Sequence, residues 1–506
     1  MARQECEKRT AARAAGLVVT FALLCAAASG AQAVAPAAMK AQEALSRARA
    51  TLTRGDARSA MEILRKLRAD FPGTDVEREA LGLSVQAALA TGDAYKARYF
   101  YQTLSASAPS SRPAFASSIL LADYYYRQRD WLLSLSLYTD AVEGFRDGIS
   151  GSPAQLDQAL LRAAELSLYH NADLAGARAF LQQITPAAIA GGDALLYRQL
   201  RVRLLWKALP SSVFGLADSN VSSLRIDDDD LWVGTWNGGV ARYSVSSGQS
   251  DAFPLPAFSR SLEVADRRVW VGTSEGLSWY GKVTGRWGSE QDFAAPDARN
   301  VQVVRLTSAG LFAGTLGDGL FRLEDAGWTA VADGSLPGRF ITSLAEDPSR
   351  KALLIGTMNL GLVILDLSTG SITALDELVP DFTSNNITTI LRASDGKVWI
   401  GTYGDGIWSW DPTAGKLRHY SQETGEISND WILSSAETDR ALYFGSFGGG
   451  VSVLGKKTGA WRHFGIADGL ASLDVAAIAW RAPYVFFGTL GAGVSQYDEE
   501  ADGTLP

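Results

Sequence analysis

Histidine is the first side chain to consider for catalysis, and the 506-residue chain has three, His170, His419 and His463. A catalytic triad or a histidine-ligated zinc needs a histidine beside convergent partners. His419 in LRHYS and His463 in WRHFG instead occupy the same place in two copies of a repeat, which predicts surface positions on outer strands. HExxH, phosphate-loop and dinucleotide motifs are absent from the sequence, and GxSxG occurs at Gly272–Gly276 inside a repeat unit, where it spans the end of a strand and the turn after it. We therefore predict a non-catalytic protein with no cofactor and no bound metal.

The run Asp227–Asp230 is the one charge cluster larger than a turn requires. Calcium prefers carboxylate ligands, but carboxylates adjacent in sequence seldom converge on one ion without an interleaved glycine and backbone carbonyls. We interpret the run as a solvated acidic turn, and a calcium site is the alternative.

The N-terminal segment has the features of a secretory signal. Basic residues precede an apolar run from Ala14 to Ala28, and Ala31-Gln32-Ala33 has the small residues that signal peptidase requires. We predict a signal peptide over residues 1–33, a mature chain beginning near Val34, and a periplasmic or secreted location.

A retained membrane anchor is disfavoured because a spanning helix needs about 20 apolar residues, more than this run provides. No transmembrane segment is therefore expected after signal cleavage. Lipidation at Cys25 is an alternative, although Leu24 stands where a lipoprotein signal has a small residue. Cys6 also lies in the signal, so the mature chain has no cysteine for a disulfide or a metal.

The composition is that of a globular protein, with 47% hydrophobic and 20% charged residues. Its formal net charge of -8 argues against a nucleic-acid partner and against an anionic membrane surface.

Residues 34–210 are predicted to form helical hairpins. The segments RGDARSAMEIL, TGDAYKARYFY, QRDWLLSLSLY and NADLAGARAFL each place an aspartate four residues before a small residue. The aspartate suits a helix N-cap, and the small residue allows two helices to approach closely. The pairs are Asp56 and Ala60, Asp93 and Ala97, Asp130 and Ser134, and Asp173 and Ala177.

These hairpins resemble the tetratricopeptide repeat over residues 41–186, although its Trp-Leu-Gly opening is absent. The resemblance implies a concave surface that binds peptides or partner proteins. The alternative is that the hairpins only pack against the rest of the protein or hold it away from an anchor.

A sevenfold repeat follows, with units such as LWVGTWNGGVARY and VWIGTYGDGIWSW. Its period of 38 to 45 residues is that of a four-stranded propeller blade. We predict a seven-bladed β-propeller over residues 211–498 and a C-terminal tail over 499–506. One large residue per unit is expected to pack between blades: Trp232, Trp270, Phe312, Leu354, Trp399, Tyr443 and Phe486.

The seventh unit has no fourth strand of its own. SVFGLADSNVSSL, which begins at Ser212, parallels RHFGIADGLASLDVAAI, which begins at Arg462. We therefore predict that Ser212–Leu216 supplies the outer strand of the last blade, which would remove an unpaired sheet edge.

The units resemble the two-component regulator propeller, whose repeats carry a similar Trp-(Ile/Val)-Gly-Thr core. In that family such propellers often form the periplasmic sensor of membrane-bound histidine kinases, and several are associated with carbohydrate sensing. The resemblance implies the fold and a binding role. A signalling role is left open, because this sequence has no kinase or DNA-binding domain.

The candidate binding residues follow each Gly-Thr. The turn between the second and third strands of a blade lies at the same end as the connection into its first strand. Aromatic and amide groups there could stack on sugars or hold a peptide; alternatively, they fold back and plug the central channel. The candidates are Trp236, Asn237, Leu316, Asp318, Met358, Asn359, Tyr403, Asp405, Phe447 and Leu490.

Together these features predict an exported adaptor or scaffold of the cell envelope that binds protein partners through its helical repeats and its propeller. The alternative is a periplasmic receptor whose propeller binds a glycan or a peptide. A propeller lyase or hydrolase that uses aspartates is the third and most remote possibility.

Overall fold

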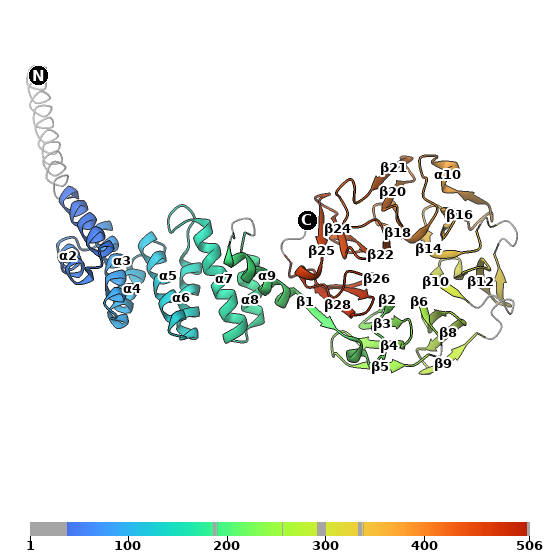
Figure 1. Ribbon diagram of the computed structural model, residues 1–506, viewed down its shortest axis with the longest axis horizontal. Coiled ribbons are helices and arrows are strands. Elements are labelled where there is room, and N and C mark those ends of the chain that lie inside the picture. The colour runs from blue at the N-terminus through green and yellow to red at the C-terminus, as the bar shows by residue number, and fades with distance from the viewer. Residues whose placement is uncertain are drawn as a thin grey trace, which may run out of the picture. The chain divides into compact units, whose positions relative to one another are not determined.

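The computed structural model describes residues 38–185, 189, 191–255, 257–290, 300–331, 336 and 338–502. The predicted signal peptide and Cys25 lie outside these residues. The chain divides into two compact units, Met1–Tyr197 and Arg198–Pro506, which are helical and β-sheet respectively (Figure 1). Among the described residues, no helix has the length and apolar character needed to span a membrane.

The first unit is a series of antiparallel helices in which successive helices pack together. Residues 38–53 are helical. The following helices are α2 (Ala57–Asp70), α3 (Asp75–Ala90), α4 (Ala94–Ser107), α5 (Arg112–Arg127), α6 (Trp131–Gly144), α7 (Pro153–His170) and α8 (Leu174–Gln182). The helix α9 (Gly192–Leu205) follows them.

The expected capping pattern is confirmed in α2, α4, α6 and α8. The Asp56 carboxylate accepts a hydrogen bond from the Ser59 N–H, and Asp93, Asp130 and Asp173 cap their helices in the same way. Each aspartate satisfies a backbone donor that the first helical turn leaves unpaired. The small residue that follows each cap is fully buried, which permits close helix packing: Ala60, Ala97, Ser134 and Ala177.

The second unit is a seven-bladed β-propeller made of four-stranded antiparallel sheets. Blade 1 comprises β2 (Val221–Asp227), β3 (Asp230–Thr235), β4 (Gly239–Ser244) and β5 (Ser250–Phe253). Blade 2 comprises β6 (Ser259–Val264), β7 (Arg268–Thr273), β8 (Gly276–Gly281) and β9 (Arg286–Ser289). Blade 3 comprises β10 (Val301–Thr307), β11 (Gly310–Thr315), β12 (Leu320–Glu324) and β13 (Gly327–Ala330).

Blade 4 comprises β14 (Ile341–Asp347), β15 (Ala352–Thr357), β16 (Leu362–Asp366) and β17 (Ile372–Ala374), followed by the short helix α10 (Leu375–Leu378). Blade 5 comprises β18 (Ile387–Arg392), β19 (Val398–Thr402), β20 (Ile407–Asp411) and β21 (Lys416–Tyr420). Blade 6 comprises β22 (Ile432–Glu437), β23 (Ala441–Ser446), β24 (Val451–Gly455) and β25 (Trp461–Phe464). Blade 7 contains β26 (Val475–Arg481), β27 (Tyr484–Thr489) and β28 (Gly493–Asp498).

The outer strand of blade 7 is β1 (Trp206–Leu209), which pairs antiparallel with β28. The prediction that Ser212–Leu216 forms this strand is wrong, because Ser211–Phe214 is a 3-10 helix, η2. Pro210 is the physical reason. It has no N–H to continue the ladder, and the 3-10 helix begins at the next residue.

The two residues of each Gly-Thr pair have different structural roles. A Cβ on Gly314 would lie 2.4 Å from the Ile341 side chain of the next blade, and one on Gly488 would lie 2.5 Å from Val221. Glycine is therefore required where neighbouring blades meet. The Thr402 hydroxyl donates to the Gly406 carbonyl at 2.8 Å and thereby closes the turn after the second strand. Ser446 donates to Gly450 in the same way, which explains why serine can replace threonine in blade 6.

The expected packing residues lie between the blades as predicted. All seven, from Trp232 to Phe486, are at most 4% exposed. Their burial holds each sheet against the next, and it leaves the turns at the two ends of the propeller free to carry other side chains.

Candidate functional site

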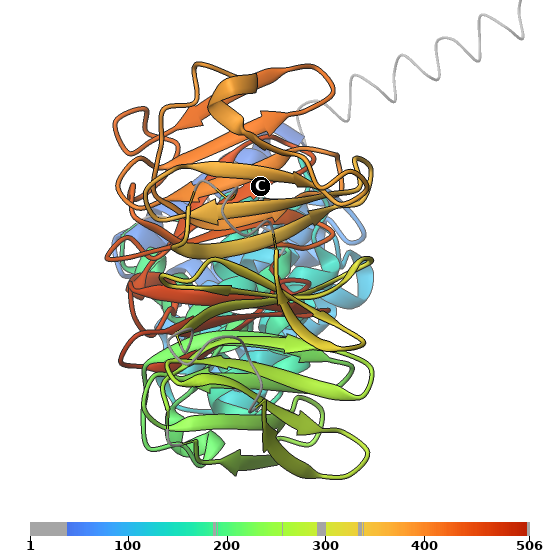
Figure 2. The ribbon, with the colours of Figure 1, turned by 90° about the vertical axis from the view of Figure 1, so that its right-hand side faces the viewer.

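The candidate residues lie at one end of the propeller, which we call the aromatic face. In all seven blades the backbone N–H after Gly-Thr (or Gly-Ser in blade 6) donates to the residue that precedes the first strand of the same blade. In blade 5 the Tyr403 N–H donates to Asn386 at 3.1 Å, and in blade 6 Phe447 donates to Trp431 at 2.9 Å. Two side chains per blade are thereby held at this end. Figure 2 shows the blades edge-on, with their strands running between the two ends.

Most of the apolar candidates face solvent. Trp236 is 43% exposed, Met358 45%, Tyr403 49% and Phe447 42%, whereas Leu316 and Leu490 are half-buried. None of these side chains lines the cavity between the first strands of the blades. The rings therefore form a surface and do not fill the channel.

Trp431 was not among the sequence candidates, yet it organises this surface. Its ring stacks on Tyr403 at 4.7 Å and on Phe447 at 5.8 Å, with interplanar angles of 25° and 27°. Trp431 itself is 41% exposed. We call Tyr403, Trp431 and Phe447 the aromatic stack.

The signal that could have identified Trp431 is its position directly before a first strand. Phe258 and Phe340 hold the same position in blades 2 and 4, and they are 44% and 43% exposed. Leu360 and Leu473 add further exposed apolar groups at this end. The aromatic face therefore extends over more blades than the sequence candidates indicated.

The polar candidates differ in how they are held. Asn237, Asp318 and Asn359 are exposed, and Asp405 is half-buried. The Asp405 carboxylate accepts a hydrogen bond from Trp408 Nε1 at 3.0 Å, and its backbone carbonyl lies 2.8 Å from His419 Nε2. Asp405 therefore fixes the turn below the aromatic stack.

The three histidines are separated, and each has a structural contact. His170 stacks on Trp131 at 4.1 Å, and His419 stacks on Trp408 at 4.2 Å. His463 lies 3.2 Å from the Ser452 hydroxyl, and burial lowers the pKa of its imidazole. Within the described ranges, no group of three or more potential metal ligands converges.

The opposite end of the propeller, which we call the polar face, carries ion pairs that join neighbouring blades. Lys282 of blade 2 lies 2.8 Å from the Asp227 carboxylate, and Arg481 of blade 7 lies 2.9 Å from Asp229. Hydrogen bonds from Ser246 and Ser244 lower the pKa of Asp229. The interpretation of the aspartate run as a solvated turn is therefore incomplete, because two of its carboxylates bind across blade boundaries.

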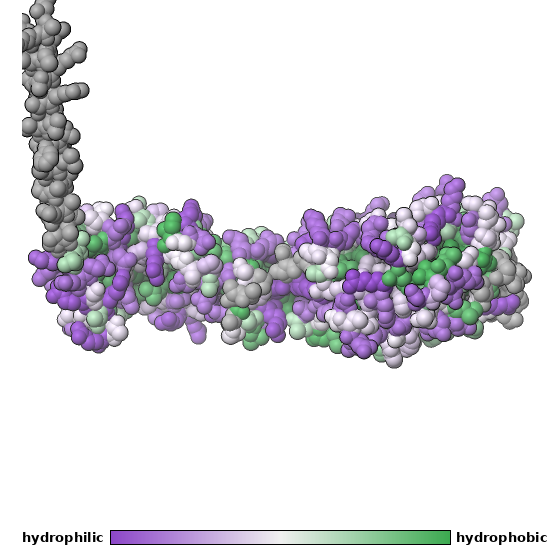
Figure 3. All heavy atoms as spheres, turned by 90° about the horizontal axis from the view of Figure 1, so that it is seen from above, coloured by the Kyte–Doolittle hydropathy of each residue, from purple (hydrophilic) through white to green (hydrophobic). Residues whose placement is uncertain are grey.

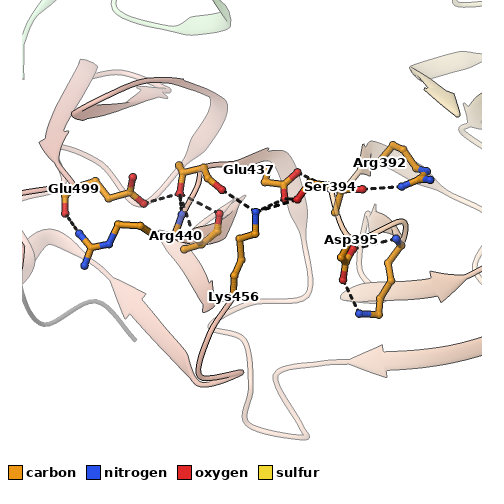
Figure 4. Close-up of polar contacts among 11 residues, drawn as sticks. Arg392, Ser394, Asp395, Glu437, Arg440, Lys456 and Glu499 are labelled. Carbon is orange, nitrogen blue, oxygen red and sulfur yellow. Dashed lines mark hydrogen bonds and ion pairs between the residues drawn. The ribbon is translucent and has the colours of Figure 1, made fainter. Parts of the chain in front are cut away.

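A second group of contacts on the polar face joins blades 5, 6 and 7 (Figure 4). The Glu437 carboxylate accepts hydrogen bonds from Ser394 and from Lys456 Nζ, the latter at 2.6 Å. The Glu499 carboxylate accepts from the Thr438 hydroxyl at 2.6 Å and from Tyr443 at 2.9 Å. These contacts fasten the segment after β28 to blade 6.

A cavity of about 770 Å³ lies between blades 5 and 6, with Trp399, Tyr420 and Trp461 among its lining residues. Three of its cations are paired within the protein, since Lys397 binds Asp395 at 2.6 Å, Arg418 binds Glu426 at 3.1 Å, and Lys456 binds Glu437. Figure 3 views the rim where Figure 1 places β21 and α10, and apolar residues gather there among polar ones. The repeat pattern did not indicate this cavity.

The family comparison agrees with the propeller. Residues 381–404, which lead through the first two strands of blade 5, match the family model described as the two component regulator propeller. No curated protein matches the chain.

Several solved structures are similar in fold. An extracellular domain assigned to a hybrid two component system from B. thetaiotaomicron matches with 17% identity and a TM-score of 0.49, over 58% of this chain and 42% of that one. An extracellular domain assigned to a one component system from the same organism matches with 18% identity and a TM-score of 0.46, over 57% and 42%.

YCF48 from Cyanidioschyzon merolae matches with 14% identity and a TM-score of 0.45, over 58% of this chain and 99% of that one. The match spans less than half the length of the two B. thetaiotaomicron domains. The chain thus carries a two component regulator propeller repeat, within a seven-bladed β-propeller that follows a series of helical hairpins.

Proposed function

We propose that this protein is an exported, non-catalytic adaptor of the cell envelope whose propeller binds a protein partner on the aromatic face. The observation that carries the proposal is the aromatic stack, three neighbouring rings that are 41% to 49% exposed. Large apolar groups gathered at one end of a folded domain are typical of interaction sites. Tryptophan and tyrosine in particular supply much of the binding free energy at protein interfaces.

The stack is also ordered before any partner arrives. Backbone hydrogen bonds fix the turns that hold Tyr403 and Phe447, and Trp431 stacks on both of their rings. Binding therefore restricts few side-chain rotations, which reduces the entropic cost of association.

Ring orientation favours a protein partner over a glycan. A sugar stacks on the flat face of an aromatic ring. Trp431 stacks on both of its neighbours, which leaves less of its ring face open to a sugar. A stack of rings that already contact one another suits the apolar side chains of a peptide segment better than a pyranose ring.

The helical unit offers a second surface for a partner. Tyr95 and Tyr99, four residues apart on α4, are 85% and 60% exposed. Residues at this spacing lie on the same side of a helix. An adaptor role for both units is consistent with these exposed rings.

A displayed peptide library tests the proposal directly. The purified chain is compared with the triple variant Tyr403→Ala, Trp431→Ala, Phe447→Ala. The control variant Val283→Ala, Leu306→Ala removes exposed apolar groups from the other end of the propeller, where they are 88% and 41% exposed. We expect the unmodified chain and the control to enrich peptides with apolar residues, and the triple variant to bind them roughly 30-fold or more weakly, since such anchors commonly contribute about 2 kcal/mol or more.

A glycan array probed with the same three proteins separates the alternatives. Binding of a glycan that depends on the aromatic stack, without peptide enrichment, would support the receptor instead of the adaptor. Equal peptide enrichment by all three proteins would overturn a role for the aromatic face.

A further inference from the structure

The first strands of the blades enclose a cavity of about 260 Å³ at the centre of the propeller. All its lining residues come from β2, β6, β10, β14, β18, β22 and β26. The aromatic-face residues do not contribute to it, so its chemistry can be considered separately.

Each first strand has a register irregularity at its second residue. A β-bulge redirects a side chain away from the regular alternation of the strand. The residue at this place lines the central cavity in every blade, so seven bulged side chains surround it. They are Ser222, Arg260, Gln302, Thr342, Thr388, Leu433 and Ala476.

The wall formed by blades 5–7 satisfies its own polar groups. The Thr388 hydroxyl donates to the Ile432 carbonyl at 2.6 Å, and the Ser434 hydroxyl donates to Val475 at 2.9 Å. Leu433 and Ala476 are apolar. This wall therefore needs no further hydrogen-bond partner.

The wall formed by blades 1–3 is different, because several of its buried polar atoms have no hydrogen-bond partner. These atoms are the hydroxyl oxygens of Ser222, Ser223 and Ser261, Nε of Arg260 and Oε1 of Gln302. Buried polar groups in folded proteins are nearly always paired with protein, water or a ligand. Most of the unpaired groups here can donate hydrogen bonds.

This wall also carries an excess of positive charge. Arg225 and Arg305 share one carboxylate, that of Glu263, at 3.2 and 3.5 Å. Arg260 has no ion pair among the described residues. Burial lowers the pKa of Arg305 in spite of Glu263, although about a third of its side chain is exposed.

We propose that the blade 1–3 wall of the central cavity binds a small oxyanion, with Arg260 as its principal ligand and the hydroxyl of Ser222 as a further donor. A guanidinium group pairs with carboxylate, phosphate or sulfate through two parallel hydrogen bonds. The cavity has room for such an anion together with a few waters, each of which occupies about 30 Å³. The inference does not depend on the aromatic face.

Calorimetric titration of the mature chain with sodium phosphate and with sodium acetate, at constant ionic strength, tests the site. Arg260→Gln removes the principal ligand. Arg267→Gln removes the same charge from an exposed turn of the same blade and is the matched control. We expect Arg260→Gln to weaken binding of the preferred anion about 10- to 100-fold, as loss of a charge-assisted hydrogen bond does, and Arg267→Gln to leave it unchanged.

The preferred probe identifies the anion. Tighter binding of phosphate assigns a tetrahedral oxyanion, and tighter binding of acetate assigns a carboxylate. No heat with either probe, or equal loss in both variants, would overturn the proposal and leave water as the occupant.

Thermal melting supplies a second readout. Leucine and alanine occupy the Arg260 position in blades 6 and 7, so the fold tolerates its replacement. Without added anion, we expect Arg260→Gln to melt no lower than the unmodified chain, because charge repulsion is relieved. A stabilising anion should raise the melting temperature of the unmodified chain and of Arg267→Gln but not of Arg260→Gln. An equal rise in all three would indicate a general salt effect and contradict a specific site.

Discussion

On the aromatic face, Trp236 and Tyr403 remain more than two-fifths exposed, whereas on the polar face Glu499 is 3% exposed and bound by blade 6. The same seven sheets build both ends. The first and second strands join at the polar face, where carboxylates connect one blade to the next. The turns after Gly-Thr close on their own threonine hydroxyls, and their backbone also bonds to the next blade, since the N–H groups of Gly404 and Gly406 donate to the Asp430 carbonyl. Both ends therefore hold the ring together, but the polar face does so with side-chain carboxylates and the aromatic face with backbone hydrogen bonds, which leave its side chains free to vary for recognition.

The ring is closed by the pairing of β1 with β28, so variants that disrupt β1 should lower the free energy of unfolding most. Trp206 packs against Phe464, Phe487 and Tyr497, and Leu209 is 1% exposed. We expect the double variant Trp206→Ala, Leu209→Ala to lower the free energy of unfolding by roughly 5 kcal/mol or more, because both changes remove buried packing. Chemical denaturation monitored by tryptophan fluorescence measures this change.

The control for ring closure is Val213→Ala in η2, within the segment that the sequence wrongly assigned to this strand. It should cost about 1 kcal/mol or less, since its side chain is only half-buried. A larger cost at Val213 than at β1 would show that η2 closes the ring.

The polar face should show a smaller but clear dependence on single carboxylates. Glu437→Ala removes the acceptor for Ser394 and Lys456, whose ammonium is then left partly buried without its partner. We expect a loss of about 2 kcal/mol in the free energy of unfolding. The exposed Glu500 is the matched control, and Glu500→Ala should change stability by less than about 0.5 kcal/mol. Equal effects at the two positions would argue against a structural role for the polar face.

Stability should depend little on the aromatic face. Trp431→Ala is expected to cost about 1 kcal/mol, because two-fifths of its side chain is exposed in the folded protein. Trp399, which is 4% exposed, is the comparison, and its replacement by alanine should cost roughly 3 to 5 kcal/mol. Thermal melts of both variants measure the difference. A cost at Trp431 as large as at Trp399 would mean that the stack is part of the core.

The contributions of two polar-face carboxylates, Glu499 and Glu437, to the free energy of unfolding should change with pH in opposite directions. Burial raises the pKa of Glu499, against its hydrogen bonds from Thr438 and Tyr443. Burial also opposes ionisation of Glu437, but Lys456 and Ser394 outweigh it and lower the pKa of that carboxyl. The stability that Glu437 contributes is therefore present above its ordinary pKa and is lost as the pH falls through the lowered value. Ionising the buried Glu499 lowers the free energy of unfolding, and this loss appears as the pH rises above the ordinary pKa of a glutamate.

Glu499→Gln keeps an acceptor for Thr438 and Tyr443 and removes the charge. We expect it to be as stable as the unmodified chain or more stable by up to about 1 kcal/mol at neutral pH, with the difference vanishing in acid. The gap between the unmodified chain and Glu437→Ala should also close in acid, since protonation removes the ion pair. Denaturant titrations at several pH values measure both gaps. If the difference in stability between Glu499→Gln and the unmodified chain grew on acidification, this would contradict a raised pKa for Glu499.

The fold could be predicted because its signals are periodic. Gly-Thr recurs where a blade must approach its neighbour closely, and aspartate recurs where a helix must be capped, as at Gly314 and Asp56. The closing strand was misplaced because SVFGLAD does resemble RHFGIAD, but Pro210 ends the first strand before that similarity begins. A repeated pattern locates equivalent residues, while a single proline decides the local backbone.

The candidate surface was predicted only in part, for a related reason. Residues after Gly-Thr are aligned by the repeat, so Tyr403 and Phe447 could be named, whereas Trp431 lies in a connection of variable length. The asymmetry of the central cavity escaped prediction because a β-bulge depends on strand register, which the sequence does not display. Whether Arg260 meets an acidic partner is decided by blades far from it in the chain.

The pairing of β1 with β28 has a consequence for biosynthesis. The strand at Trp206–Leu209 is synthesised before every blade, and its partner Gly493–Asp498 follows almost all of the propeller. A chain that stalls or is cleaved before Gly493 therefore cannot complete its last sheet, however well its earlier blades have formed. Its unpaired strand edges would expose it to chaperones and proteases. Pairing of β1 with β28 therefore separates full-length chains from truncated ones.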